Sequence, residues 1–190
     1  MGRSNGNRKR IEAKEKCGVR VLISSNSLLG QSGYSTQSAG IARSLQRMGH
    51  EVSFYSWYGL ETGQLDINGI RVYPRLDDNT RHGTDAYLIA KYDGADACLT
   101  LQDIWVLPPR FAERFEDCKW LAYFPVDSEP APPVVVQRAK TAHYPVVYSR
   151  FGQEMMRDAG LECAYVPHAI DTETFRPHPD RDAHRKAHGV

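Results

Sequence analysis

The chain of 190 residues has few of the features that mark several large classes of protein. No apolar run approaches the length of a membrane-spanning helix, and the first residues lack the apolar core of a signal peptide. The 24 Lys and Arg residues nearly balance the 23 Asp and Glu residues, so the net charge of +1 gives no case for binding nucleic acid. We therefore expect a cytoplasmic protein with no transmembrane segment and no nucleic-acid partner.

Cysteine is scarce, and its spacing argues against the common zinc modules. The four cysteines are Cys17, Cys98, Cys118 and Cys163, which are far apart and form no CxxC pair. Three of them lie in apolar, strand-like runs, which indicates buried free thiols in a reducing compartment. The sequence therefore predicts no metal site.

One stretch joins a short apolar run to a glycine-containing loop and an amphipathic segment. The run Val19–Ile23 predicts a buried parallel strand, and Gly30 and Gly33 lie in the loop after it. A helix is expected to begin near Ser35, which can cap it, and to end at Gly49 in a left-handed conformation. Such a unit aims backbone N–H groups at the carboxyl edge of a sheet, where phosphates bind. An ordinary strand-to-helix turn fits equally well, because the full G-x-G-x-x-G fingerprint is absent.

Downstream, strand-like runs alternate with helical segments about six times. Further strands are expected at 51–57, 96–101, 119–124, 144–148 and 163–166, with a hairpin around Asn68-Gly69. Helices are expected at 84–92, 108–116, 132–142 and 149–159. This alternation predicts an α/β fold, a Rossmann-like doubly wound and mostly parallel sheet with helices on both faces.

The two ends of the chain differ in composition from this region. Residues 1–16 are basic and almost free of apolar side chains, which predicts a flexible, solvated tail, with weak contact to anionic lipid or RNA as the alternative. Residues 17–171 are expected to form the Rossmann-like domain. Residues 172–190 carry prolines and many charges and are expected to be a linker that leaves the domain.

Polar residues follow several of the predicted strands. They are Ser35, Asp103, Asp127, Ser149 and His168. Ligands of doubly wound sheets bind beyond the carboxyl ends of the strands, so we expect Gly33, Tyr34, Ser35, Asp103 and Asp127 to line one concave surface. Loops are polar in most domains, so this convergence does not define a site by itself.

The closing part of the domain carries the most specific motif. The stretch Val166–Pro177, VPHAIDTETFRP, is similar to the VPHGVDxxxFxP signature of family-4-type glycosyltransferases, with Ala169 where glycine is usual. Ser149-Arg150-Phe151, followed by Gly160, resembles the S-x-F…G helix of this family.

Two upstream segments extend the resemblance. Gly33-Tyr34-Ser35 lies where the family has its glycine-rich loop, and Tyr123–Asp127 (YFPVD) is similar to a YFPVDG segment of one branch. The resemblance spans about Val19 to Pro177. It implies the amino-terminal, acceptor-side domain of a B-type fold of two domains.

The resemblance also implies an activity. Such enzymes move a sugar from a nucleotide-sugar donor to an acceptor, usually with retention of configuration. The donor would be a co-substrate, no cofactor would be tightly bound, and the acceptor would be a glycan, lipid or protein. The nucleotide of the family is held mainly by a carboxyl-terminal half, and this chain stops at Val190, about where that half would begin.

We therefore expect the acceptor-side half of a retaining, hexosyltransferase-like enzyme that is inactive without its second half. The chain would be a truncated product, a fragment, or one subunit of a split enzyme whose partner is a separate carboxyl-terminal half. Residues 172–190 would then be the linker toward that absent domain.

The resemblance assigns roles to residues at the expected cleft. Many relatives place a histidine just after the strand equivalent to 119–124, where this chain reads Pro125-Val126-Asp127. Asp127 is the catalytic candidate because it is the nearest side chain able to hydrogen-bond a sugar hydroxyl; a turn residue is an equal alternative. Backbone N–H groups near Gly33 and Tyr34 would stabilise a leaving diphosphate, and polar side chains would orient the acceptor hydroxyl. The substrate-binding candidates are Gly33, Tyr34, Ser35, Gln102, Asp103, Trp105, Ser149, Arg150 and His168.

Structural roles compete with several of these assignments. Rim packing is the better account of Trp105, and fixing an interdomain hinge explains His168 at least as well as substrate contact. A non-catalytic carbohydrate-binding or interaction domain with a degenerate glycosyltransferase fold is the alternative function. An unrelated Rossmann-like nucleotide-binding module is a third reading, which the missing G-x-G-x-x-G pattern disfavours.

Overall fold

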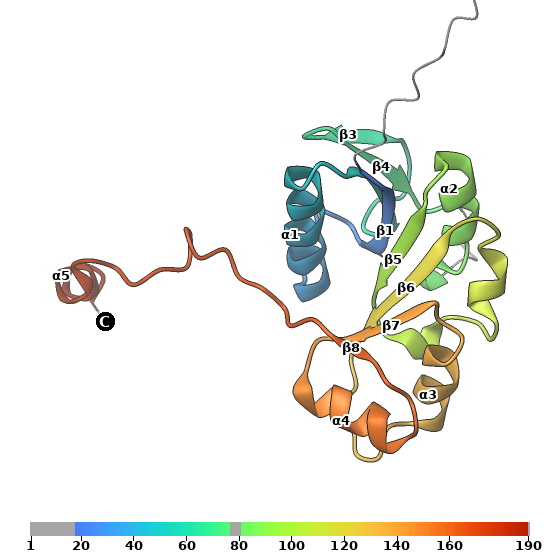
Figure 1. Cartoon of the computed structure of the whole chain (residues 1–190). Helices are drawn as coiled ribbons and strands as arrows, with labels where there is room; N and C mark the ends of the chain where they lie inside the picture. The colour runs from blue at the N-terminus through green and yellow to red at the C-terminus, as the bar shows by residue number, and fades with distance from the viewer. Residues whose placement is uncertain (1–17, 77–80, 190) are drawn as a thin grey trace, which may run out of the picture.

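The computed structural model describes residues 18–76 and 81–189, and eight strands of this part form one sheet (Figure 1). The strands are β1 (Arg20–Asn26), β2 (Glu51–Tyr58), β3 (Leu65–Ile67), β4 (Ile70–Pro74), β5 (Ala97–Leu101), β6 (Lys119–Phe124), β7 (Tyr144–Val147) and β8 (Ala164–Tyr165). Their order is β3-β4-β2-β1-β5-β6-β7-β8, and neighbours are parallel except in the β3–β4 hairpin. The predicted Rossmann-like fold is thus confirmed, with the strand order reversing between β1 and β5.

Helices connect these strands on both faces of the sheet. The α-helices of the described residues are α1 (Gly33–Arg47), α2 (Ala86–Asp93), α3 (Pro133–Ala139), α4 (Arg150–Asp158) and α5 (Arg181–Ala187). The short 3-10 segments are η1 (Arg81–Gly83), η2 (Ile104–Val106) and η3 (Phe111–Arg114). In Figure 1, α1 lies on one side of the sheet, and α2 and α3 lie on the other.

The core divides into two clusters because side chains alternate between the faces of a strand. Val21 and Ile23 of β1 pack with Ala42 of α1, whereas Leu22 belongs to the larger cluster with Ile89 of α2. The larger cluster also contains residues of α3 and α4. Strand β1 is therefore fixed by packing on both sides.

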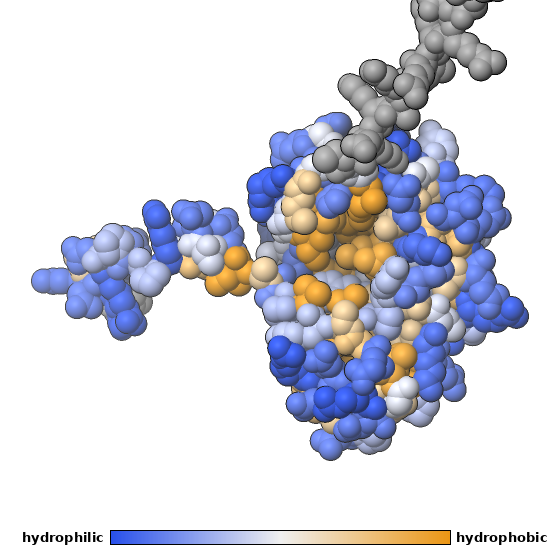
Figure 2. Space-filling view, viewed as in Figure 1, coloured by the Kyte–Doolittle hydropathy of each residue, from blue (hydrophilic) through white to orange (hydrophobic). Residues whose placement is uncertain are grey.

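The α1 side of the sheet is only partly covered. Helix α1 contacts β1 and β2. Leu99 of β5 packs at the margin of the α1 cluster, its register partner Leu121 lies on β6, and both side chains are half-buried. Figure 2 shows apolar side chains gathered over the middle of the visible face, with hydrophilic side chains around them.

The local signals of the first helix and the hairpin are largely confirmed. Asn68 and Gly69 have φ of 54° and 77°, as a two-residue hairpin turn requires, and Gly49 after α1 has φ of 87°. The predicted cap is wrong, however. Ser32, not Ser35, caps α1 and accepts a hydrogen bond of 3.1 Å from the Ser35 N–H, because the helix begins two residues earlier than expected.

The helix predicted at 108–116 is also wrong. Two 3-10 turns, η2 and η3, occupy this region. Arg110, between them, has φ of 59°, a left-handed conformation that ends any α-helix entering from Pro109. Helix α3 also ends earlier than expected, at Ala139.

The cysteines that the structure describes are free and buried, as predicted. They are Cys98, Cys118 and Cys163. Burial raises the pKa of Cys118 and of Cys163 to about 11, so both remain thiols at neutral pH. Cys17 and the predicted tail 1–16 lie outside the described residues.

The segment after β8 leaves the sheet and ends in α5, away from the other elements (Figure 1). Its side chains are exposed from Val166 to Gly189. Helix α1 holds this segment near its start, where the Gln37 side chain donates to the Ala169 carbonyl oxygen (3.0 Å) and accepts from the Ala169 N–H (3.1 Å). Helix α5 was not foreseen in the predicted linker.

Candidate functional site

Four side chains from four segments interact at the carboxyl edge of the sheet. They are Tyr34 in the first turn of α1, Asp103 after β5, Asp127 after β6 and Tyr148 after β7, which we call the tyrosine–aspartate cluster. The Tyr34 hydroxyl lies close to the Asp103 carboxylate and to the Tyr148 hydroxyl, because each of these two groups acts on the pKa of Tyr34. Asp127 lies close enough to act electrostatically on Asp103 and on Tyr148. The fold therefore brings Tyr34, Asp103 and Asp127 together and adds Tyr148, which the sequence argument did not include.

Burial and like charge set the protonation of this cluster. Burial raises the pKa of Asp103, and the negative charge of Asp127 raises it further, while the Tyr34 hydroxyl and His82 oppose that rise. Burial also raises the pKa of Tyr34 and of Tyr148, so both stay neutral phenols at physiological pH. The cluster thus offers carboxylate oxygens beside hydroxyl groups, an arrangement suited to a ligand that carries hydroxyls.

The two glycines of the α1 loop have different surroundings. A Cβ built at Gly30 would lie 2.6 Å from Ser35 Oγ, whereas a Cβ at Gly33 would meet nothing within 4 Å. Gly33 therefore borders open space at the start of α1. Ser35 is 1% exposed and its Oγ lies 2.9 Å from Ser32 Oγ, so its side chain holds the loop from beneath the surface.

The Gln102 side chain is buried, whereas the Trp105 side chain is exposed. Gln102 is 3% exposed, and its side-chain amide donates to the carbonyl oxygen of His82 (2.8 Å). Trp105 of η2 is exposed. His82, on η1, comes from the connection between β4 and α2 and was missed by the sequence argument, because no local motif links it to Asp103.

His168 contributes to an aromatic group beside the cluster. Its ring lies 4.0 Å from the Tyr148 ring and 5.6 Å from the Tyr123 ring, centroid to centroid. The Tyr123 hydroxyl donates to the Val166 carbonyl oxygen (2.8 Å), which fixes the chain as it leaves β8. Burial lowers the pKa of His168, so it is a neutral ring that both packs against the cluster and holds the exit of the chain.

Ser149 and Arg150 are engaged within the protein. Ser149 caps α4 by accepting from the Gly152 N–H (2.9 Å), as predicted. The Arg150 guanidinium lies 3.9 Å from the centre of the Tyr165 ring and donates to Gln153 (3.0 Å). Both side chains therefore stabilise the β7–α4–β8 unit.

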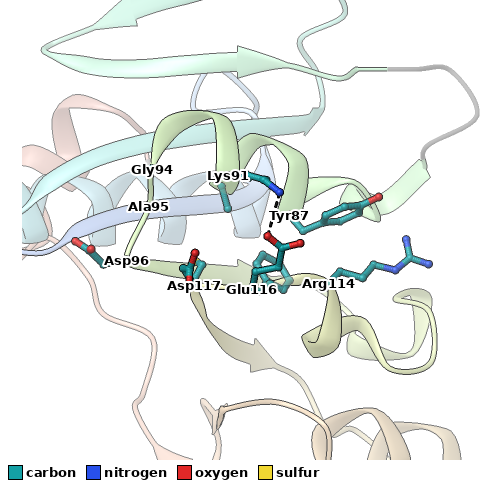
Figure 3. A pocket seen from close by; sticks show the side chains of 11 residues that line it. Tyr87, Lys91, Gly94, Ala95, Asp96, Arg114, Glu116 and Asp117 are labelled. Atoms are coloured by element: carbon teal, nitrogen blue, oxygen red, sulfur yellow. Dashed lines mark hydrogen bonds and ion pairs between the residues drawn. The ribbon is translucent and has the colours of Figure 1, made fainter.

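A cavity of about 210 Å³ lies at the opposite edge of the sheet (Figure 3). Its wall includes residues that precede β5 and β6, such as Asp96 and Asp117. Its basic groups have partners in the protein: Lys91 pairs with Glu116 (3.0 Å), and the Arg114 guanidinium lies over the Tyr87 ring. This cavity is thus separate from the tyrosine–aspartate cluster.

The described residues contain neither a membrane-spanning helix nor a cluster of metal ligands. No helix in that part of the chain is long and apolar enough to cross a bilayer. Within the same residues, no group of three or more His, Cys, Asp or Glu side chains is arranged to hold a metal ion.

The fold is similar to that of a known glycosyltransferase. The catalytic domain of starch synthase IV from Arabidopsis thaliana, solved with ADP and acarbose, matches with a TM-score of 0.55 and 12% sequence identity. The match covers 86% of this chain and 54% of that chain, so this chain spans about half the length of the solved domain. Neither a family model nor a curated protein sequence matches. At this identity the likeness shows the fold, and membership of family 4 stays a prediction.

Proposed function

We propose that this chain is the acceptor-side half of a retaining glycosyltransferase, which moves a sugar from a nucleotide-sugar donor to a hydroxyl of a glycan, lipid or protein. The observation that carries the proposal is the tyrosine–aspartate cluster, at the sheet edge where doubly wound folds bind ligands. The likeness to a starch synthase domain solved with ADP and acarbose supports the same class of reaction.

The proposed roles follow from the position of each group. In the transfer, the bond from the anomeric carbon to the donor phosphate breaks and its electron pair stays on the phosphate oxygen. The acceptor oxygen bonds to that carbon, and its proton passes to the departing phosphate oxygen. Asp103 and Asp127 would accept hydrogen bonds from the acceptor hydroxyl and so hold its oxygen on the face of the anomeric carbon from which the diphosphate departs, as retention of configuration requires. The free N–H groups in the first turn of α1, beside the open space at Gly33, would stabilise the leaving diphosphate.

We further propose that most contacts to the nucleotide lie in a second half. The match to only 54% of the starch synthase domain supports this division. The donor is then a co-substrate that binds between two domains, and Gln37 would help to set their relative position through its bonds to Ala169.

A non-catalytic carbohydrate-binding domain is the second candidate. It is favoured by the internal engagement of Ser35, Gln102 and Ser149, whose side chains form hydrogen bonds within the protein. Such a domain would bind a saccharide at the same edge of the sheet without transferring a sugar.

Transfer by a complemented chain separates the two candidates. The 190-residue chain is extended by the codons that follow Val190 in its genome, and release of nucleoside diphosphate from labelled UDP-, ADP- and GDP-sugars is measured. We expect Asp127→Asn to lower transfer about 100-fold while the melting temperature stays unchanged, because removing a positioning group weakens the transition state. Asp117→Asn, at the opposite edge, is the matched control. Saccharide binding without transfer would favour the non-catalytic domain.

A further inference from the structure

The four residues after β8 run along the carboxyl edge of the sheet before the chain leaves it (Figure 1). We call residues 166–169 the exit strap. Its first residue is held by β7 and β6, since the Val166 N–H donates to the Val147 carbonyl oxygen (3.0 Å) and the Tyr123 hydroxyl donates to the Val166 carbonyl oxygen (2.8 Å). Its last residue exchanges two hydrogen bonds with the Gln37 side chain (3.0 and 3.1 Å). The exit strap therefore joins the β6–β7 part of the sheet to α1.

The middle of the exit strap contacts the tyrosine–aspartate cluster. The His168 ring lies 4.0 Å from the Tyr148 ring, centroid to centroid, with 32° between the two planes, so the rings are partly stacked. In the described part of the chain, neither ring nitrogen of His168 has a hydrogen-bond partner within the protein. His168 therefore acts on Tyr148 through the packing of its ring.

The far end of the exit strap is tied to the helix that carries the second tyrosine. Gln37 follows Tyr34 by three residues on α1, so both side chains project from the same side of the helix. Tyr34 and Tyr148 lie close to each other and to Asp103. The exit strap thus contacts Tyr148 directly and Tyr34 through one turn of α1.

The attachments of the exit strap are few and lie at the surface. All four of its residues are exposed, and so are the residues that follow it up to Gly189. It is held by hydrogen bonds and one ring contact, with no buried apolar side chain of its own. Segments of this kind open at a lower free energy than core strands do, so the exit strap can be released while the sheet stays folded.

We propose that the exit strap regulates acceptor binding by setting the positions of Tyr148 and Tyr34 around Asp103, with His168 and Gln37 as its positioning residues. When the strap is bound along the sheet edge, the two tyrosines are held beside the carboxylate. When the part of the protein that follows the strap draws it away, His168 leaves Tyr148 and the cluster loosens. This inference rests on the proposed function and names the element that regulates the same site.

The ring signal of Tyr148 tests the strap in the absence of any ligand. The 190-residue chain is labelled with ¹³C-tyrosine, and Tyr148→Phe identifies the signal of that ring. We expect Gln37→Ala, which removes both bonds to the last strap residue, to shift the Tyr148 signal, because the released strap takes the His168 ring away from it. Circular dichroism checks that the variant stays folded.

A second glutamine of α1 provides the matched control. Gln46 also donates to a backbone carbonyl oxygen of another segment, that of Asn68 in the β3–β4 hairpin (3.3 Å). Gln46→Ala therefore removes a comparable bond from the same helix and should leave the Tyr148 signal in place. A Tyr148 signal that moves no more in Gln37→Ala than in Gln46→Ala would overturn the role of the strap.

Two substitutions of His168 separate positioning from direct contact with the acceptor. In the complemented enzyme, with the methyl α-pyranosides of glucose, mannose and galactose as acceptor probes, we expect His168→Ala to raise the KM for the acceptor about tenfold and to change kcat less, as the loss of one good contact does. His168→Phe keeps a ring that can stack on Tyr148 and should restore the KM. His184→Ala, on the exposed α5, is the control. Equal impairment of His168→Phe and His168→Ala would show that the imidazole nitrogens bind the acceptor and would overturn the positioning role.

The outcomes also separate this inference from the proposed function. Transfer whose KM for the acceptor is unaffected by both Gln37→Ala and His168→Ala would refute the regulation and leave the glycosyltransferase standing. A Tyr148 shift in Gln37→Ala, in a protein that transfers no sugar when extended, would refute the enzyme and retain the strap as the element that positions the cluster.

Discussion

Two glycines three residues apart should respond to alanine in opposite ways. At Gly30 the new Cβ would lie 2.6 Å from Ser35 Oγ and 3.1 Å from the Ser27 carbonyl oxygen, far inside normal contact. Ser35 is 1% exposed and cannot move outward freely, so we expect Gly30→Ala to lower the free energy of unfolding by about 1–3 kcal/mol, as overpacking does. At Gly33 the new Cβ meets nothing within 4 Å, and the residue lies in the first turn of a helix. Gly33→Ala should therefore raise the free energy of unfolding by about 0.4–1 kcal/mol through the loss of unfolded-chain entropy.

Of these two substitutions, the stabilising one, Gly33→Ala, should be the one that lowers activity. The stabilised Gly33→Ala variant should lose transfer in the complemented enzyme by about tenfold or more, because its methyl group occupies the space in which a phosphate approaches the helix N–H groups. Urea unfolding followed by circular dichroism gives the stabilities, and nucleoside diphosphate release gives the activities. Equal destabilisation of both variants, or full activity of Gly33→Ala, would refute the reasoning.

Three further perturbations test separate contacts. Asp93→Ala removes a buried carboxylate that accepts hydrogen bonds from Ser53 (2.6 Å), Tyr73 (2.6 Å) and Arg71 (2.7 Å). Urea unfolding should show that the free energy of unfolding falls by about 3–5 kcal/mol. A fall of less than about 1 kcal/mol would contradict this account. Asp103→Asn tests the raised pKa of Asp103, which means that the fold disfavours the ionised carboxylate. Above that pKa, the variant should therefore have a larger free energy of unfolding than the wild type. The difference should vanish as the pH falls below the pKa of Asp103 in the unfolded chain, where the carboxyl is protonated in both states. A pH-independent difference would show that the carboxylate is not perturbed. Gln37→Ala should speed hydrogen exchange at the Ala169 amide, whose N–H it leaves without its acceptor, while the control Gln64→Ala leaves that rate unchanged.

The alternation of apolar runs was sufficient to predict the parallel sheet, because buried strands and capped helices leave strong local patterns. Gly49 and the Asn68-Gly69 turn were predictable for the same reason, since each needs a positive φ that few residues adopt. The region around Arg110 was not predictable, because arginine rarely adopts the left-handed conformation that it has here, and no glycine or asparagine marks the turn.

The candidate site was predictable only in part. Tyr34, Asp103 and Asp127 follow the ends of parallel strands, so topology alone placed them at one edge. Tyr148 was missed because it ends an apolar strand and looks like core. His82 was missed because its approach to Asp103 depends on how η1 packs onto β1 and β2, a contact between segments about 20 residues apart that no local pattern records.

The most direct test of the central proposal compares the 190-residue chain with the chain extended beyond Val190, each incubated with the same labelled nucleotide sugars. If this chain is the acceptor-side half of a glycosyltransferase, the short form turns over no nucleotide sugar at a useful rate, and the extended form transfers sugar in a reaction that depends on Asp103 and Asp127. Robust transfer by the 190-residue chain alone would place the donor site within it and contradict the proposed division of the enzyme.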